Sequence, residues 1–124
     1  MNLVDSCGWL EYLADGPNAS FFAPAIENTE ELLVPSLCIL EVFKRVLQQR
    51  DESRALRAVA AMQQSMVVEL STPISLGAAK ISTELGLPMA DAIMLATARA
   101  HKATLWTQDA HFEGVEGVKY VHAR

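Results

Sequence analysis

The hydrophobic positions of the chain alternate between short β-like runs and longer stretches with helical spacing. Five short runs are predicted as strands, at residues 2–4, 32–34, 66–70, 104–107 and 118–121. The segments between several of these runs have the spacing of amphipathic helices. Strands that alternate with helices are typical of a parallel sheet covered by helices. The pattern therefore predicts an α/β fold with a central, mainly parallel sheet of four or five strands.

Proline, glycine and small polar residues predict where the helices begin and end. Gly16 and Pro17 stop the first helix, and Pro24 begins or kinks a short second one. Three later helices are bounded in the same way: Ser36 caps one that runs to about Arg50, Thr72-Pro73 opens one that Gly86 closes, and Pro88 opens one that ends near His101.

The length and composition indicate one compact domain over residues 1–124. Half of the residues are hydrophobic (51%), which is enough to bury a core in a chain of 124 residues. No apolar run approaches the ~20 residues needed to cross a bilayer, and the first residues lack the features of a signal peptide. We therefore expect a cytoplasmic protein without membrane contact. Two cysteines are too few for a disulfide framework.

The net charge of −5 argues against a protein that binds nucleic acid by general electrostatic attraction. Any contact with nucleic acid must therefore be local. The best local source is a basic group on two consecutive helical segments, formed by Lys44, Arg45, Arg50, Arg54 and Arg57. A solvated helical face is the common alternative for such a group.

Four acidic residues stand where an apolar chain tolerates charge least. Asp5 ends the first strand and Asp109 follows the fourth, while Glu41 and Asp91 interrupt apolar helical stretches. In an open α/β sheet, strand ends and first helical turns converge at the edge where ligands bind. Four carboxylates together would repel one another unless a hard divalent cation, Mg²⁺ or Mn²⁺, joined them. The pattern predicts a metal-dependent site for phosphoryl transfer.

Each acid also has a structural explanation when it is considered alone. Asp5, Asp91 and Asp109 are all suitable helix caps, and Glu41 has Arg45 four residues further on as an ion-pair partner. The joint pattern is more specific than any of its members. Two strand-end acids and two acids in apolar helices rarely coincide without a shared cation.

Four blocks of the sequence resemble those of PIN-domain ribonucleases, and most closely those of VapC-type toxins from bacterial and archaeal toxin–antitoxin pairs. The blocks are VDS at 4–6, SLCILEV at 36–42, LPMADA at 87–92 and LWTQDAHF at 105–112. The resemblance spans nearly the whole chain in the right order. It implies a three-layer α/β/α sandwich, cleavage of RNA that depends on Mg²⁺ or Mn²⁺, a homodimer, and a small antitoxin that covers the active site.

The resemblance also assigns roles to residues, position by position. The acidic quartet of the family matches Asp5, Glu41, Asp91 and Asp109, and its supporting hydroxyl residues match Ser6 and Thr107. We expect Asp5 and Asp91 to ligate the principal cation, with the other two acids completing its shell. The motifs position metal and phosphate rather than bases, so they leave the RNA target open.

Contacts with RNA and with a partner are predicted from other residues. Phosphates beside the cleaved bond are expected to meet some of Lys44, Arg45, Arg50 and Arg54. A partner is expected to place Arg or Lys near the carboxylates. Five apolar residues are predicted to form a groove that receives a helix of the partner, and a place in the core is an equal alternative for them. They are Phe21, Phe22, Val42, Phe43 and Val46.

Two other kinds of function compete with a metal-dependent nuclease. A catalytically silent PIN-like module would serve only for binding or dimerisation, although retention of all four acids disfavours it. A thiol enzyme would use Cys7 and His111, yet no ordered set of nucleophile, base and orienting group can be assembled from the sequence. We expect His101, His111 and His122 at the surface or at helix ends rather than as metal ligands.

Overall fold

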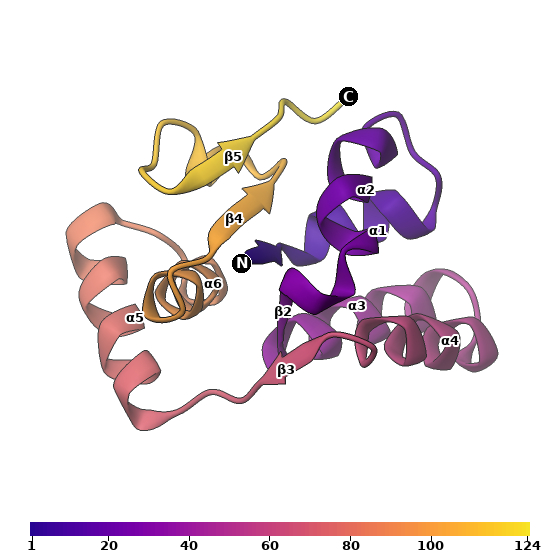
Figure 1. The fold of residues 1–124 in the computed structure, drawn as a ribbon, viewed down its shortest axis with the longest axis horizontal. Helices are drawn as coiled ribbons and strands as arrows, with labels where there is room; N and C mark the ends of the chain where they lie inside the picture. The colour runs from indigo at the N-terminus through magenta and orange to yellow at the C-terminus, as the bar shows by residue number, and fades with distance from the viewer.

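One five-stranded parallel sheet forms the centre of the protein. The computed structural model describes residues 1–124, and the sheet has the order β3-β2-β1-β4-β5 with every neighbouring pair parallel (Figure 1). The strands are β1 (Asn2–Val4), β2 (Leu32–Pro35), β3 (Met66–Val68), β4 (Thr104–Thr107) and β5 (Val118–Tyr120). The predicted α/β class and the number of strands are confirmed.

Six α-helices cover both faces of this sheet. They are α1 (Ser6–Leu13), α2 (Ala19–Glu27), α3 (Ser36–Gln49), α4 (Glu52–Met62), α5 (Thr72–Leu85) and α6 (Met89–Ala100), with short 3₁₀ turns η1 (Thr29–Glu31) and η2 (Ala110–Phe112). The pair α5–α6 lies on one side of the sheet, and α1 to α4 lie on the other (Figure 1). This division follows from right-handed crossovers, because the chain moves outward from β1 to β3 and then returns past β1 to β4. The predicted three-layer α/β/α sandwich is confirmed.

Several predicted boundaries shift by one or two residues. The third strand ends at Val68 rather than at residue 70, because its only partner, β2, ends at Pro35 and continues directly into α3. For the same reason Pro35, and not Ser36, is the cap residue of α3. Pro24 lies inside α2 and does not begin it.

The later helix boundaries agree better with the prediction. Ser71 caps α5, its hydroxyl accepting a hydrogen bond from the Ile74 N–H at 3.3 Å, and Pro73 lies in the first turn. Gly86 ends the helix in the left-handed conformation, with φ of 69°. Pro88 precedes α6, and His101 follows its last residue, as predicted.

The core consists of the central strands and the helix faces that cover them. Leu3, Val4 and Leu105 are fully buried in the strands, as expected where both faces of a parallel sheet are covered. Of the five residues predicted to form either a groove or part of the core, Phe21, Phe43 and Val46 are only partly buried. Phe22 and Val42 are fully buried, so for these two the core alternative is confirmed. Their apolar side chains are used by the fold itself. No helix has the length and apolar character needed to span a membrane.

Two helical glycines differ in the space around them and offer a matched test of the packing. A Cβ on Gly8 would lie 2.6 Å from Cε1 of Phe22 and 2.7 Å from Cγ1 of Val4, whereas one on Gly77 would lie 3.9 Å from Cβ of Ala96. We expect Gly8→Ala to lower the free energy of unfolding by about 1–3 kcal/mol through overpacking. Gly77→Ala should raise it by about 0.5–1 kcal/mol, because alanine favours the helix. Urea denaturation of both variants measures the difference, and equal effects would contradict the close packing of α1 on the sheet.

Candidate functional site

The candidate site lies where the order of the strands reverses. The chain leaves β1 toward β2, but β4, on the other side of β1, continues toward the opposite edge. Connections diverge at such a switch point and leave a crevice beyond the carboxyl ends of the strands. Asp5 stands at this point, and its backbone N–H extends the sheet by donating to the Trp106 carbonyl at 3.0 Å.

Asp5 is a buried carboxylate with fixed hydrogen bonds. Its side chain accepts from the backbone N–H of Ser6 (2.8 Å) and from the hydroxyl of Thr107 (2.9 Å), and the residue is only 4% exposed. Burial raises the pKa of Asp5 to about 6, although both hydrogen bonds oppose the change. The negative charges of Asp91 and Glu41 raise the pKa of Asp5 further.

Glu41 reaches the same crevice from the second turn of α3. Burial raises the pKa of this half-buried residue, the Ser6 hydroxyl opposes the shift, and the charge of Asp91 adds to it. No ion pair joins Glu41 to Arg45, so that structural explanation is not realised. The charge of Asp91 acts on Glu41, and that of Glu41 acts on Asp5.

Asp91 approaches from the opposite layer. It is the third residue of α6, and α6 leads through a short turn into β4, so its first turn lies at the carboxyl edge of the sheet. Burial is the main cause that raises the pKa of Asp91, followed by the charge of Asp109, while His111 lowers it. The positive end of the helix dipole favours a carboxylate at this position.

Asp109 and His111 complete the cluster from the turn after β4. The backbone N–H of Asp109 donates to the Thr107 hydroxyl at 3.0 Å, and Oδ1 of Asp109 accepts from the His111 N–H at 2.9 Å. Nδ1 of His111 lies 2.9 Å from Oδ2 of Asp91 and 3.1 Å from Oδ1 of Asp109. The charge of Asp109 and the hydrogen bond with Asp91 raise the pKa of His111.

The structure thus brings all four predicted acids together, with Thr107 linking Asp5 to Asp109. It also adds His111, which is at the surface as expected, with 58% of its side chain exposed, but belongs to the cluster. The signal in the sequence was its position two residues after Asp109. Only the fold could show that it also meets α6.

The predicted basic residues divide into two groups. Lys44 and Arg45 are exposed on α3, three and four positions after Glu41, and therefore lie about one turn from it on the same side of the helix. Arg50 and Arg54 instead line a separate cavity with Arg57. Arg50 follows the last residue of α3 and lies about 14 Å along the helix from Glu41, given the rise of 1.5 Å per residue.

Asn18 supports the site and was missed from the sequence. The residue is 3% exposed, and its amide donates to the Gln108 side chain at 2.9 Å and to the His122 carbonyl at 3.0 Å. It therefore holds the segment between Thr107 and Asp109. An asparagine after Gly16-Pro17 looks like an ordinary turn residue, so the sequence carried no signal of this contact.

Cys7 lies beside Asp5 but lacks the properties of a nucleophile. Its Sγ is 3.6 Å from Oδ2 of Asp5 and 3.4 Å from Oγ1 of Thr107. Burial and the charge of Asp5 raise the pKa of Cys7 to about 12, so the thiol keeps its proton at neutral pH. This disfavours a thiol enzyme.

The chain matches the family described as PIN domain over residues 3–118. The chain belongs to the PIN domain family. A search among curated proteins finds no match.

Solved structures with the same PIN fold cover nearly the whole chain. A toxin–antitoxin complex from Klebsiella pneumoniae aligns with a TM-score of 0.80 and 24% identity over 96% of each chain. VapC20 of Mycobacterium tuberculosis, a toxin that cleaves the sarcin-ricin loop, aligns with a TM-score of 0.78 and 12% identity over 94% of this chain and 95% of that one. DNA-bound VapBC from Salmonella typhimurium has a TM-score of 0.75 and 15% identity over 98% of each chain.

The donor set of this PIN domain fits a divalent cation. Ligand atoms of Asp91, Asp109 and His111 all lie within 4.8 Å of one another. The charge of Asp91 also raises the pKa of Asp5 and of Glu41. Carboxylate oxygens suit Mg²⁺ and Mn²⁺, and an imidazole nitrogen suits transition ions. Burial is the main cause that raises the pKa of Asp5, Glu41 and Asp91, and neighbouring carboxylates raise it further.

The pKa of Asp5 predicts how the stability of the metal-free PIN domain depends on pH. The folded state holds this proton more tightly than the unfolded state, so the contribution of Asp5 to stability falls as the pH rises from about 4 to about 6. Asp5→Asn removes this loss. Above about pH 6, we expect the free energy of unfolding of the variant to exceed that of the wild type by up to about 3 kcal/mol. Near pH 4 the two values should differ little.

Denaturant unfolding at several pH values, with a chelator present, measures this difference. Glu84→Gln, which changes an exposed carboxylate on α5, is the control and should leave the pH profile unchanged. A constant difference between Asp5→Asn and wild type across the range would contradict the buried, charged carboxylate.

Proposed function

We propose that this PIN domain is an endoribonuclease that depends on Mg²⁺, with Mn²⁺ as a substitute, and acts as the toxin of a toxin–antitoxin pair. The observation that carries the proposal is the convergence of Asp5, Glu41, Asp91 and Asp109 at the switch point of a PIN fold. The chain is proposed to act as a single PIN-like domain over residues 1–124. Since its substrate would be cellular RNA, we place it in the cytoplasm.

The proposed mechanism assigns the four acids to one cation. Asp5 and Asp91 would be its principal ligands, with Glu41 and Asp109 completing the set. When bound, the cation would activate a water and stabilise charge on the phosphoryl oxygens. The Thr107 hydroxyl fixes the orientation of Asp5, and its acceptance of the Asp109 N–H fixes the turn that carries the fourth acid. Ser6 restrains Asp5 through its backbone N–H, and its hydroxyl lowers the pKa of Glu41.

RNA is the proposed substrate because one structural relative, VapC20, is a toxin that cleaves the sarcin-ricin loop. The net charge of −5 means that phosphate must be attracted by the cation and by local cations of the chain. Lys44 and Arg45 are the best placed for this because they follow Glu41 on the same side of α3. Arg50 and Arg54 are the more distant candidates. Such contacts would position the strand without selecting its sequence.

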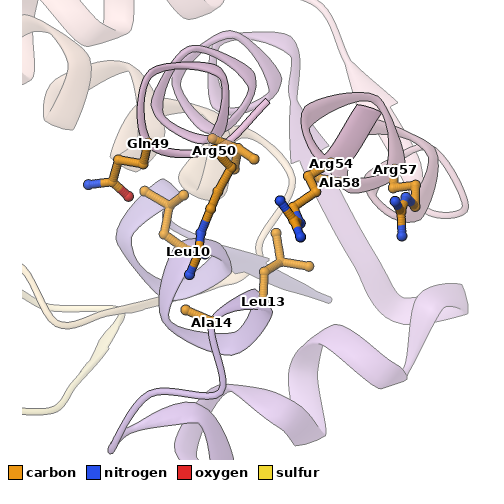
Figure 2. A pocket seen from close by; sticks show the side chains of 9 residues that line it. Leu10, Leu13, Ala14, Gln49, Arg50, Arg54, Arg57 and Ala58 are labelled. Carbon is orange, nitrogen blue, oxygen red and sulfur yellow. The ribbon is translucent and has the colours of Figure 1, made fainter. Parts of the chain in front are cut away.

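A cavity beside the helices supports a protein partner, in keeping with the antitoxin complexes among the structural relatives. It measures about 500 Å³ and opens between α1, α3 and α4, where Arg50 extends toward Leu10 and Ala14 and Arg54 lies over Leu13 (Figure 2). Arg50 and Arg57 have no ion-pair partner in the chain. We propose that a segment of the antitoxin with apolar and acidic side chains fills this cavity, while an Arg or Lys elsewhere in the antitoxin approaches the carboxylates.

A homodimer is also proposed. Its support is a set of large apolar side chains that remain exposed around α5 and α6, namely Leu76, Leu85 and Met89, with exposed fractions of 64%, 49% and 78%. Burial of such side chains is a common driving force for association.

Replacing the four acids tests the nuclease. We expect Asp5→Asn, Glu41→Gln, Asp91→Asn and Asp109→Asn each to reduce metal-dependent RNA cleavage, by at least about 100-fold for a direct ligand, since even indirect support of a metal contributes 10–100-fold. Circular dichroism should show an intact fold, and Glu84→Gln should retain full activity. Sequencing of RNA ends after brief expression gives activity and target together. Full activity of Asp5→Asn or Asp91→Asn would contradict the site, and a wild-type protein without any cleavage would favour a silent binding module.

The two basic surfaces can be separated by paired variants. Arg45→Ala should weaken cleavage of many RNAs alike, flatten the dependence on salt and leave the cut site unchanged. Leu13→Asp and Arg57→Glu should weaken binding of the antitoxin encoded beside this protein and leave cleavage unchanged. Cleavage assays at several salt concentrations and co-purification from the native operon provide the two measurements. If Arg45→Ala affects only the antitoxin, or the cavity variants affect only cleavage, the assignment of the surfaces is wrong.

A further inference from the structure

His111 places a nitrogen donor among the carboxylates of the site. Its Nδ1 lies 2.9 Å from Oδ2 of Asp91 and 3.1 Å from Oδ1 of Asp109. Neighbouring ligands at right angles around an ion, each about 2.1 Å from it, are separated by about 3.0 Å. The nitrogen therefore lies at the spacing of a neighbouring ligand from each of the two carboxylate oxygens, and all three atoms lie within 4.8 Å of one another.

The backbone holds His111 in this position. Asp109 caps η2 by accepting the His111 N–H at 2.9 Å, and Phe112, the next residue, is fully buried in the core. The ring is thus carried by a short turn that is fixed on both sides. It meets α6 at Asp91, although the two residues are 20 positions apart in the sequence. A histidine that merely faced water would need neither restraint.

We infer that His111 is a nitrogen ligand of the cation and raises the affinity of this site for a first-row transition ion, Mn²⁺ or Zn²⁺, relative to Mg²⁺. The inference rests on the proposed metal site and adds its specificity. Mg²⁺ takes oxygen ligands and keeps its water, whereas imidazole binds transition ions well and Zn²⁺ more tightly than Mn²⁺. Carboxylate oxygens suit Mg²⁺ and Mn²⁺ alike, so the imidazole of His111 is the donor that would shift the relative affinity toward transition ions.

Spectroscopy on the wild-type protein tests the ligand directly. With Mn²⁺ bound at a mildly alkaline pH, where the imidazole can be neutral, pulsed electron paramagnetic resonance should show modulation by a directly coordinated nitrogen. His111→Asn should lose this modulation. His101→Asn, which changes a histidine whose ring lies against the Thr97 carbonyl at the end of α6, should retain it. Bound Mn²⁺ without nitrogen modulation in the wild type would overturn the inference, even if the variants failed to fold.

Equilibrium binding tests the preference between ions. Titration calorimetry with Mn²⁺ and with Mg²⁺ should show that His111→Asn weakens Mn²⁺ binding by about 10- to 100-fold and Mg²⁺ binding much less. Equal losses for the two ions, or none, would mean that His111 is only a hydrogen-bond partner of the two acids. Asp91→Asn is the reference and should weaken both ions. If the wild type bound neither ion, the proposed metal-dependent function would fail with the inference; if it bound both and His111→Asn left their ratio unchanged, the inference alone would fail.

Discussion

The burial of one carboxylate at the switch point of the sheet is the constraint on which the site depends. Asp5 cannot leave the end of β1, because its N–H completes the ladder with β4 and its carboxylate caps α1. Its second oxygen is bound by Thr107 at the end of β4. The two central strands therefore fix the side chain, and every other acid is placed relative to it by the element that carries it.

This arrangement opposes stability in the absence of a ligand. Burial and mutual repulsion raise the pKa values of Asp5, Glu41 and Asp91, so the folded chain keeps like charges where water is scarce. His111 is the one cationic group of the chain that lies within the cluster, and it contacts only the two outer acids. The inner pair, Asp5 and Glu41, has hydroxyl and amide donors but no positive partner. Unrelieved charge of this kind is typical of functional sites.

The acidic cluster and the main group of arginines lie on different parts of the protein. Asp5, Asp91 and Asp109 belong to the carboxyl edge of the sheet, while Arg50, Arg54 and Arg57 gather around a partly apolar cavity between helices (Figure 2). Arg54 is paired there with Asp51 at 2.7 Å, whereas Arg50 and Arg57 have no ion-pair partner in the chain.

The sequence by itself determined the class of fold and the identity of the four acids. Short β-rich runs and intervening helical periods follow from local preferences, and an acid in an apolar helix such as Asp91 is visible without coordinates because its burial needs a reason. The motifs around these acids also indicated the PIN domain family. The cap of α3 was predicted at Ser36 but lies one residue earlier, at Pro35, because the end of a strand depends on where its neighbour stops.

Only the tertiary structure decided which side chains meet. Phe22 and Val42 have the same apolar character as groove residues, and packing alone assigned them to the core. Asn18 and His111 gained their contacts from segments 90 and 20 positions away, a separation that no local pattern records. Arg50 and Arg54 looked equivalent to Arg45 along the chain, yet the end of α3 and the start of α4 place them at a separate cavity. Local sequence sets what each segment can form, whereas these contacts follow from how the layers pack.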